Sequence, residues 1–346
     1  MREILPLFNE IVEELVKEEK INPVAERIPP EELYSKLDLS LSSSPIGDEE
    51  WKEILRSLVL STPRTSTNAF FNQLFGGRNN KAVLGDLLAV VLNNSMYTYK
   101  VAGPQVGVEK MVLEEVCSLI NWGEKADGTF APGGSMANLM GLLMARDAFD
   151  ERIKDVGTKV DLIVYTSAES HYSVEKNASF AGIGKKNVRK IPVLSSGKMD
   201  VGELEAQIKR DRENGLQPLM VNATAGTTVL GVFDDIDGIA NICKNEELWL
   251  HVDGAYCGSV IFSKKYKHLI KGLERADSFC FNAHKMIGTP LICSILVTKD
   301  RANLYNSLSQ DAEYLYQTDA DEFNLGKTSL QCGRRNDALK FWTLWK

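Results

Sequence analysis

Apolar residues follow two different patterns along this chain. In the N-terminal part they recur at helical spacing, interrupted by Pro29 and Pro30 and by a polar stretch at 41–45. The first such segment carries one apolar stripe, formed by Ile4, Leu7, Phe8, Ile11, Leu15 and Val16. We predict that residues 1–60 form a helical N-terminal segment, whose stripe packs on the next domain or on a partner subunit.

From about residue 104, short apolar runs bounded by turn residues alternate with helical stretches. The runs are 161–166, 189–194, 218–223, 248–253, 278–282 and 291–298. Helices are expected near 105–121, 135–149, 201–215, 235–246 and 263–273. This alternation predicts an α/β fold, in which a mostly parallel sheet is covered by helices on both faces. We take residues 61–346 as that large domain.

Composition and charge exclude several classes of protein. Of the 346 residues, 44% are hydrophobic and 25% are charged, which is ordinary for a globular chain. The net charge is −7, from 40 Lys and Arg against 47 Asp and Glu, so the sequence lacks the dense positive charge of a nucleic-acid-binding protein. It also contains no apolar stretch long enough to cross a membrane, and its N-terminus does not have the pattern of a secretory signal.

The six cysteines are scattered and form no CxxC pair; they are Cys117, Cys243, Cys257, Cys280, Cys293 and Cys332. This distribution favours free thiols over disulfides or a metal site, and hence a reducing, cytoplasmic location.

Two charged residues directly follow predicted strands. Asp253 ends the run 248–253, and Lys285 follows the run 278–282, beside His284. Ligands gather at the carboxyl ends of strands in open α/β sheets. A desolvated lysine at such a place has a lowered pKa and can form a Schiff base with an aldehyde. Taken alone, each residue also fits a plainer interpretation, as a surface lysine or a helix-capping aspartate.

Three further segments bring polar groups to strand ends or to a helix start. Gly134 and Ser135 begin a predicted helix whose free N–H groups suit phosphate, although they also suit a simple helix cap. His171 lies in a loop after the run 161–166, where it could stack on an aromatic ligand or remain solvated. The segment 222–228 ends in small and hydroxyl residues, including Thr228. Together, a phosphate cradle, a stacking histidine, a carboxylate and a Schiff-base lysine are what pyridoxal phosphate requires.

The motifs that contain these residues resemble those of the group II pyridoxal-phosphate-dependent amino-acid decarboxylases of fold type I. They are GGSMAN, SAESHYS, NATAGTT, LWLHVDGAY and FNAHKMIG, and they occur in that family's order at about its spacing, over essentially the whole chain. The resemblance implies a mostly parallel, seven-stranded sheet, pyridoxal phosphate as cofactor, and a homodimer with each active site at the subunit interface.

The resemblance also implies a role for each candidate residue. Lys285 would form the Schiff base, Asp253 would pair with the pyridine nitrogen and keep it protonated, and His171 would stack on the ring. The other contacts to the phosphate or the ring would come from Gly134, Ser135, Thr228, Ala255, Asn282 and His284.

Residues 70–75 and 97–99 resemble the branch that acts on glutamate, cysteine sulfinate and aspartate. Gln73 matches a residue that contacts the distal acid group of the substrate. Phe75 and Tyr97 look more like the cysteine sulfinate type, and a bulky Phe75 would shorten the pocket, unless both are ordinary core residues. The expected reaction is therefore decarboxylation of an acidic L-amino acid, with cysteine sulfinate or aspartate favoured and glutamate as the alternative.

Two features depart from the family. The loop 317–331 corresponds to the mobile catalytic loop but is shorter and carries Phe323 and no tyrosine. Either another donor, such as His171 or a tyrosine from elsewhere, supplies the proton, or the loop behaves as in more distant bacterial members. The small C-terminal domain, which supplies an arginine for the substrate's α-carboxylate, is missing, and a predicted helix at 332–346 has no stop signal. We therefore expect a part of a longer protein. A catalytically silent or truncated partner subunit and a decarboxylase for basic or aromatic amino acids remain as alternatives.

Overall fold

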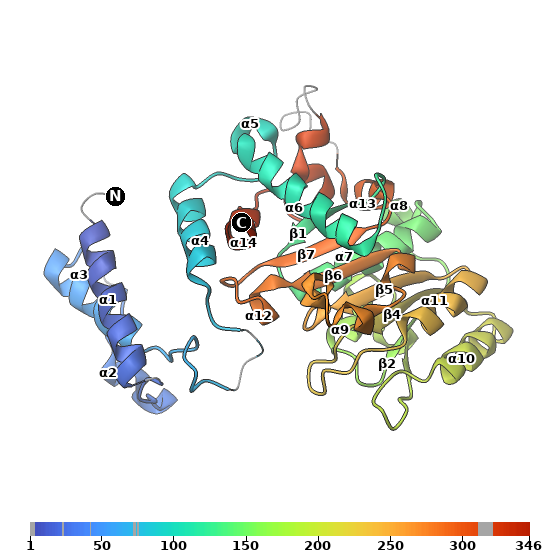
Figure 1. Cartoon of the computed structure of the whole chain (residues 1–346), viewed down its shortest axis with the longest axis horizontal. Coiled ribbons are helices and arrows are strands. Elements are labelled where there is room, and N and C mark those ends of the chain that lie inside the picture. The colour runs from blue at the N-terminus through green and yellow to red at the C-terminus, as the bar shows by residue number, and fades with distance from the viewer. Residues whose placement is uncertain (1–3, 23, 42, 72–73, 75, 311–320) are drawn as a thin grey trace. The chain divides into compact units, whose positions relative to one another are not determined.

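The computed structural model describes residues 4–22, 24–41, 43–71, 74, 76–310 and 321–346 (Figure 1). The chain divides into two compact units, Met1–Gln73 and Leu74–Lys346, whereas the sequence analysis placed the boundary after residue 60. Each unit is described by itself.

The first unit is helical, as expected. It contains α1 (Leu5–Ile21), α2 (Leu33–Lys36) and α3 (Asp48–Ser61). α1 packs on α3, and Arg56 of α3 donates from Nε to Glu14 of α1 at 2.7 Å. Ile11 of the predicted stripe is buried, whereas Phe8 and Val16 are exposed. The proposed role of this segment in dimerisation remains a prediction.

The second unit is built on a seven-stranded sheet in the order β1-β7-β6-β5-β4-β2-β3. The strands are β1 (Asp127–Ala131), β2 (Leu162–Ser167), β3 (Val188–Ile191), β4 (Gln217–Thr224), β5 (Trp249–Gly254), β6 (Ser278–Asn282) and β7 (Ser294–Thr298). β7 is antiparallel to β1 and β6, and all other neighbouring pairs are parallel. The predicted α/β class and mostly parallel sheet are therefore confirmed. β1 was not foreseen, because DGTFA has no clear apolar run; it forms by pairing with β7 and is covered by α6 and α13.

Helices cover both faces of the sheet. One face packs α7 (Gly134–Phe149), α9 (Ser173–Phe180) and α13 (Arg301–Leu308). The opposite face packs α6 (Pro104–Ile120), α10 (Val201–Glu213), α11 (Ile236–Asn245) and α14 (Ala338–Trp345). The other α-helices in the described part of this unit are α4 (Asn80–Leu92), α5 (Tyr99–Ala102), α8 (Ile153–Val156) and α12 (Ala283–Met286).

The helix expected near 263–273 does not form. Two short 3-10 turns, Lys267–Ile270 and Leu273–Arg275, take its place. They are separated by Gly272, which has a φ of +93° and lies so close to the backbone of Asp237 that a Cβ would come within 2.6 Å of its Cα. The left-handed conformation required by this close approach interrupts the helical pattern.

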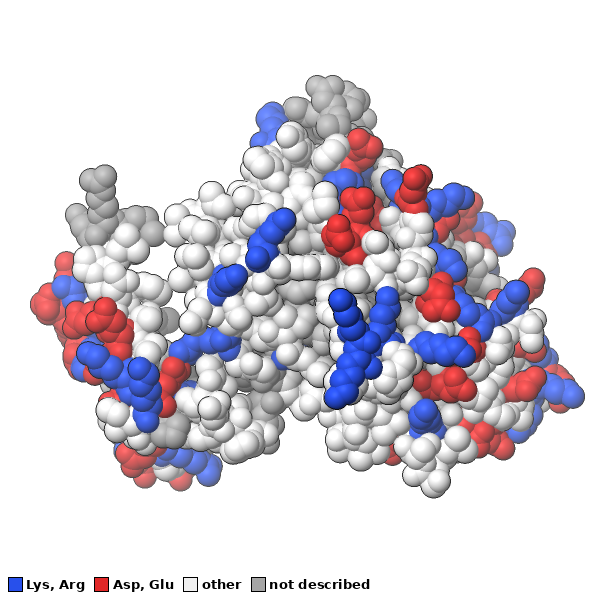
Figure 2. Space-filling model, viewed as in Figure 1, with Lys and Arg blue, Asp and Glu red and all other residues white. Residues whose placement is uncertain are grey.

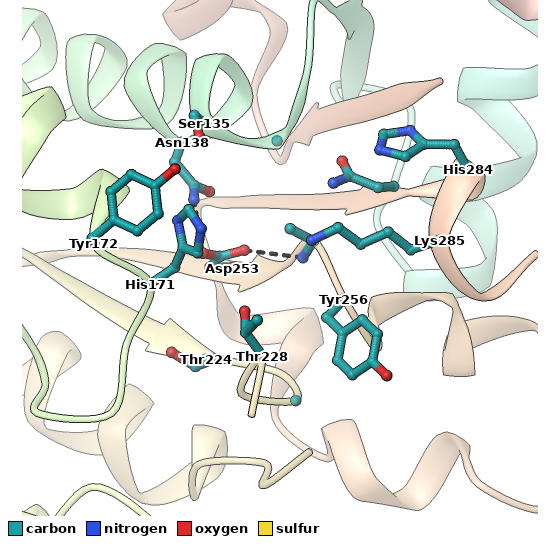
Figure 3. Close-up of a pocket in the computed structure, with 14 residues that line it drawn as sticks. Ser135, Asn138, His171, Tyr172, Thr224, Thr228, Asp253, Tyr256, His284 and Lys285 are labelled. Atoms are coloured by element: carbon teal, nitrogen blue, oxygen red, sulfur yellow. Dashed lines mark hydrogen bonds between the residues drawn. The ribbon is translucent and has the colours of Figure 1, made fainter. Parts of the chain in front are cut away.

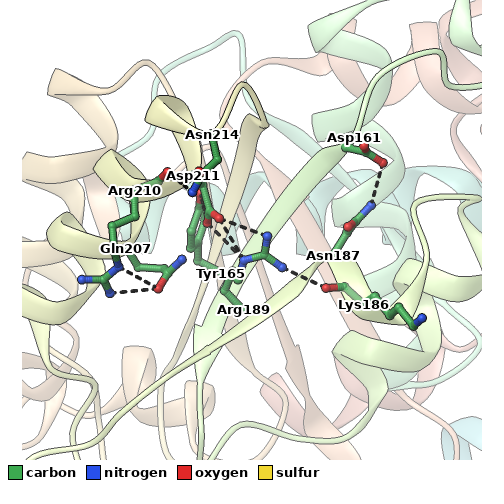
Figure 4. Close-up of polar contacts among 9 residues, drawn as sticks. All are labelled: Asp161, Tyr165, Lys186, Asn187, Arg189, Gln207, Arg210, Asp211 and Asn214. Atoms are coloured by element: carbon green, nitrogen blue, oxygen red, sulfur yellow. Dashed lines mark hydrogen bonds and ion pairs between the residues drawn. The ribbon is translucent and has the colours of Figure 1, made fainter.

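A buried polar cluster ties α10 to β2 and β3 (Figure 4). Asp211 of α10 accepts a hydrogen bond from the Tyr165 hydroxyl at 3.0 Å and pairs with the guanidinium of Arg189 at 3.0 Å. Burial, reinforced by the nearby Asp211 charge, raises the pKa of Tyr165 well above its usual range, so the phenol stays protonated as a donor. This cluster fastens α10 to the edge of the sheet formed by β2 and β3.

Candidate functional site

A cavity of about 230 Å³ opens where the carboxyl ends of β2, β4, β5 and β6 meet the start of α7 (Figure 3). All nine residues expected to contact a cofactor line it: Gly134, Ser135, His171, Thr228, Asp253, Ala255, Asn282, His284 and Lys285. They converge because parallel strands end at the same edge of the sheet. Five other lining residues were not singled out individually, although each lies in or beside a quoted motif: Asn138, Tyr172, Thr224, Gly226 and Tyr256.

Lys285 lies on the short helix α12, directly after β6. Its amine points across the cavity towards the Asp253 carboxylate (Figure 3). Burial lowers the pKa of Lys285, while the charge of Asp253 acts in the opposite direction. The net lowering increases the fraction of uncharged amine, which is the form that attacks an aldehyde. The backbone here is closely packed, since a Cβ on Gly76 would come within 2.4 Å of the Lys285 carbonyl oxygen.

Asp253 lies near the end of β5, between β4 and β6, and is 4% exposed. Its Oδ1 accepts the backbone N–H of Ala255 at 2.9 Å, and its Oδ2 accepts the Asn138 amide at 2.7 Å. Both carboxylate oxygens are thus held by donors from the protein, which fixes the orientation of the group at the edge of the cavity.

His171 follows β2, and its ring lies 4.2 Å from the ring of Tyr172, centroid to centroid. Burial lowers its pKa, with a smaller opposing effect from Asp253, so the ring is neutral near pH 7. Its Nδ1 accepts the backbone N–H of Ser173 at 3.2 Å, and the ring hydrogen therefore lies on Nε2. The ring lies beside the Asp253 carboxylate (Figure 3).

Neutral donors gather at the opposite end of the cavity, around the N-terminus of α7. Gly133 precedes this helix with a φ of +118°, and a Cβ on Gly134 would come within 2.7 Å of the Asn282 amide nitrogen. The Ser294 hydroxyl donates to Asn282 Oδ1 at 2.7 Å. This orients the Asn282 NH₂ group towards Gly134, where its hydrogens join the free N–H groups of the helix.

His284 also lies at this end. Its Nδ1 lies 3.0 Å from both the backbone nitrogen and the carbonyl oxygen of Cys293. Burial lowers its pKa to about 4, so the ring is neutral. A long helix that begins beside several neutral donors is a site for an anion such as a phosphate group.

These features fit the predicted pyridoxal phosphate. The donor-rich end suits its phosphate, the His171 ring can cover its aromatic face, and the lysine and carboxylate lie at opposite sides of the remaining space. Thr224 adds a structural observation. This residue lines the cavity, and its Oγ1 is buried, yet the oxygen has no hydrogen-bond partner within the described part of the chain. Buried hydroxyls are normally satisfied, so this one is a candidate contact for a polar ligand atom.

The predicted substrate residues are less clearly placed. Gln73 and Phe75 lie outside the described residues, as do positions 317–320 of the loop 317–331. Tyr97 is half-buried and does not line the cavity; its carbonyl accepts the N–H of Gly326. Phe323 packs edge-on against Tyr99, with ring centroids 5.6 Å apart.

The described residues hold neither a candidate metal cluster nor a helix suited to crossing a membrane. No cluster of three His, Cys, Asp or Glu side chains there could hold a metal ion. None of the helices in the described ranges combines the length and the apolar character needed to cross a membrane.

Comparison with known proteins agrees with the geometry. The pyridoxal-dependent decarboxylase conserved domain matches residues 30–346. Human acidic amino acid decarboxylase GADL1 is 41% identical over 344 residues, which is 97% of this chain and 66% of the relative. Rat cysteine sulfinic acid decarboxylase is 39% identical over 348 residues, covering 98% of this chain and 70% of the relative.

Solved structures show the same fold. The crystal structure of mouse CSAD superposes with a TM-score of 0.94 at 36% identity, covering 99% of this chain and 73% of that one. The structure of rice TDC with pyridoxal phosphate and tryptamine superposes with a TM-score of 0.90 at 27% identity, covering 99% and 73%. The chain spans about two thirds of the length of the curated relatives it matches. From the site's geometry and these matches together, we conclude that the chain belongs to the pyridoxal-dependent decarboxylase family.

Proposed function

We propose that this protein is a pyridoxal-phosphate-dependent carboxy-lyase that converts an acidic L-amino acid into its amine and CO₂. The observation that carries the proposal is the pair of Lys285 and Asp253. Their amine and carboxylate face each other across a cavity that has an anion-binding helix terminus at one end. The named activities of the similar proteins, acidic amino acid decarboxylase and cysteine sulfinic acid decarboxylase, support the acidic substrate.

When bound, pyridoxal phosphate supplies an aldehyde that captures amines and a ring that accepts the electron pair left by CO₂. The protein's own residues anchor and orient it. Lys285, with its lowered pKa, would be the amine that holds the aldehyde. Asp253 would pair with the ring nitrogen, and His171 would stack on the ring. Gly134, Ser135, Asn282 and His284 would hold the phosphate.

The protein's further contribution is to hold charge and geometry in advance of the reaction. Asp253 is fixed by two donors, so it need not reorganise as charge moves into the ring. The neutral His171 and His284 rings avoid placing extra positive charge in the cavity. The hydrogen on His171 Nε2 is available for proton transfer, and His171 remains our candidate proton donor from the described residues.

We favour cysteine sulfinate or aspartate as the substrate, and glutamate is the alternative. The expected basis is the bulk of Phe75 and Tyr97, with Gln73 contacting the distal acid group. The test is CO₂ release by the purified protein loaded with pyridoxal phosphate, with cysteine sulfinate, aspartate, glutamate, lysine and tryptophan compared at equal concentrations. We expect kcat/KM for a three-carbon acid to exceed that for glutamate by about tenfold or more, since one methylene is worth roughly 1–3 kcal/mol in a shaped pocket. A preference for lysine or tryptophan would contradict the proposal.

We also propose that the protein is a homodimer, and that α4 lies in its interface. Gly85 packs α4 against α14, where a Cβ would come within 2.8 Å of the Lys340 Cα. The other face of α4 exposes Leu84, Leu88 and Val91, which are 55%, 47% and 56% exposed. Figure 2 shows mostly uncharged surface over this helix. A contiguous apolar face of this kind indicates a partner surface.

Placing a charge on this face tests the dimer. We expect Leu88→Glu to weaken dimerisation by about a hundredfold, because the carboxylate would lose its hydration in an apolar interface. Sedimentation equilibrium measures the dissociation constant. Val156→Glu, on the exposed face of α8, is the matched control and should remain a dimer. A wild-type protein that is monomeric at micromolar concentration would overturn the dimer, and dimerisation of Leu88→Glu with unchanged affinity would exclude α4 from the interface.

We further propose a reducing, cytoplasmic location. Five of the six cysteines are buried and free, and the sixth, Cys332, is exposed and free. Such thiols persist where disulfides do not form.

A further inference from the structure

A chain of hydrogen-bonded side chains leads from Asp253 into the core of the second unit. Asn138, on α7, donates from Nδ2 to Asp253 Oδ2 at 2.7 Å. Behind it, His251 Nε2 lies 3.0 Å from Asn138 Oδ1, and His251 Nδ1 lies 2.8 Å from the Ser278 hydroxyl. The Trp249 indole donates to that hydroxyl at 2.9 Å. Asn138, His251 and Ser278 are 4%, 0% and 0% exposed.

The direction of these hydrogen bonds can be deduced from the Asp253 end. A carboxylate only accepts, so the Asn138 atom that faces it is the amide nitrogen. The Asn138 oxygen therefore faces His251, and it can only accept. His251 must then carry its hydrogen on Nε2, which leaves a lone pair on Nδ1.

The other end of this chain of hydrogen bonds accommodates the same direction. The Trp249 indole N–H can only donate, so the Ser278 oxygen accepts it. The Ser278 hydrogen is then free to be donated to His251 Nδ1. Burial lowers the pKa of His251 to about 4, and the ring is therefore neutral with a single hydrogen. The tautomer deduced from the Asp253 end therefore also satisfies Ser278, and along this chain of hydrogen bonds every donor points towards Asp253.

A second branch links Asn138 to His171. The Asn138 amide nitrogen lies 3.4 Å from the Ser173 hydroxyl, and that hydroxyl lies 2.8 Å from His171 Nδ1. Because His171 Nδ1 also accepts the Ser173 backbone N–H, the Ser173 hydroxyl donates to it and accepts from Asn138. One buried amide therefore contacts both the carboxylate and the group that orients the histidine ring.

The His251 ring fits beside α7 because residue 141 of this helix is a glycine. A Cβ on Gly141 of α7 would come within 2.7 Å of His251 Nδ1 and 2.8 Å of its Cε1. Any larger residue would displace the imidazole that supports Asn138. The helix whose N-terminus begins the anion site thus also carries, one turn further on, the amide that reaches the opposite end of the cavity.

We propose that Asn138 and His251 are positioning residues that set the orientation of both Asp253 and His171 around the ring of the cofactor. This inference rests on the proposed function. Asn138 supports both Asp253 and the Ser173 hydroxyl that orients His171. His251 holds the Asn138 side chain so that its amide oxygen faces His251 and its NH₂ group faces the site. Neither residue takes part in bond making or breaking.

The test compares His251→Leu with His251→Gln in the protein loaded with pyridoxal phosphate. Leucine fills a similar volume without polar atoms, whereas glutamine can donate to Asn138 and accept from Ser278. Asn138→Leu removes the shared support itself. The measurements are kcat and KM, the dissociation constant of the cofactor, and the visible circular dichroism per bound cofactor, which reports how the ring is held.

We expect the two leucine variants to lower kcat by about ten- to a hundredfold, the range found for residues that hydrogen-bond to metal ligands. KM should stay within about threefold, and the visible circular dichroism should change. His251→Gln should recover most of both signals. Equal behaviour of His251→Leu and His251→Gln, or a wild-type dichroism and kcat for Asn138→Leu, would overturn the proposal.

Ser278→Ala keeps the test decisive if the leucine variants do not fold, because it removes one buried hydroxyl and nothing else from the chain of hydrogen bonds. Ser278→Ala should lower kcat several-fold and alter the visible circular dichroism. If both kcat and the dichroism equal those of wild type, the proposed role of His251 is overturned. Failure of the proposed function would look different. The wild-type protein would then show no visible band with pyridoxal phosphate, or a band that survives Lys285→Ala.

Discussion

Replacing Lys285 with alanine should abolish the visible absorption band that forms when the protein binds pyridoxal phosphate. The band requires a Schiff base, and Lys285 is the lysine whose amine points into the cavity towards Asp253. We expect CO₂ release to fall by about 10⁴-fold or more, as for the loss of other covalent catalysts. Absorption spectra and release of labelled CO₂ measure the two effects. Folding should be retained, because the variant removes an amine whose burial disfavours its charge.

Lys285→Arg provides the matched control for charge. Arginine keeps a positive side chain of similar length, but its guanidinium stays protonated and does not attack an aldehyde. The arginine variant should therefore lack the band as completely as the alanine variant. Both variants should still bind the cofactor, more weakly, through the donors around the N-terminus of α7. Decarboxylation at the wild-type rate by either variant would refute the assigned role of Lys285.

Replacing Asp253 with asparagine should slow kcat by about 10²–10³-fold while the cofactor remains bound within about tenfold of its normal affinity. Asparagine has the same shape and keeps one oxygen to accept from Ala255 or Asn138, but it has no charge. The lost electrostatic contribution is of the size found when one preorganised group is removed from an active site. Single-turnover CO₂ release and cofactor titration separate the rate from the binding.

Asp277→Asn is the control for this change. Asp277 immediately precedes β6 at the opposite edge of the sheet, where it accepts the backbone N–H of Leu250 at 2.7 Å. Burial raises its pKa, so it is a partly desolvated carboxylate outside the cavity. The Asp277→Asn replacement should change the free energy of unfolding and leave kcat within about threefold of wild type. An unchanged kcat for Asp253→Asn, or an equal loss in the two variants, would argue against a specific role for Asp253.

Much of the fold could be predicted because hydrophobic periodicity is local. The apolar runs near 161–166, 218–223 and 248–253 predict strands, and each overlaps a strand in the structure. β1 could not be recognised in the same way, since Asp127, Gly128 and Thr129 become strand residues only through pairing with β7. At 263–273 the sequence pattern predicts a helix that the structure does not form. Gly272 lies against the backbone of Asp237 in a left-handed conformation, which interrupts the helical pattern.

The candidate site could be predicted to a similar extent, and for a related reason. Lys285, Asp253 and His171 each follow a strand, and the ends of parallel strands meet at one edge, so sequence order alone placed them together. The supporting residues gave no such signal. Asn138 and His251 are separated along the chain and come together only when α7 packs on β5, with Gly141 against the imidazole.

The sequence by itself determined the alternation of strands and helices, the strand ends that carry chemistry, and the cofactor that those residues suit. These properties depend on residue type and on spacing along the chain. Only the tertiary structure decided which buried partner each side chain has, and therefore which ring nitrogens of His171 and His251 carry hydrogen. Hydrogen-bond direction depends on neighbours brought together by packing, and so the orientation of Asp253 was determined by the folded core.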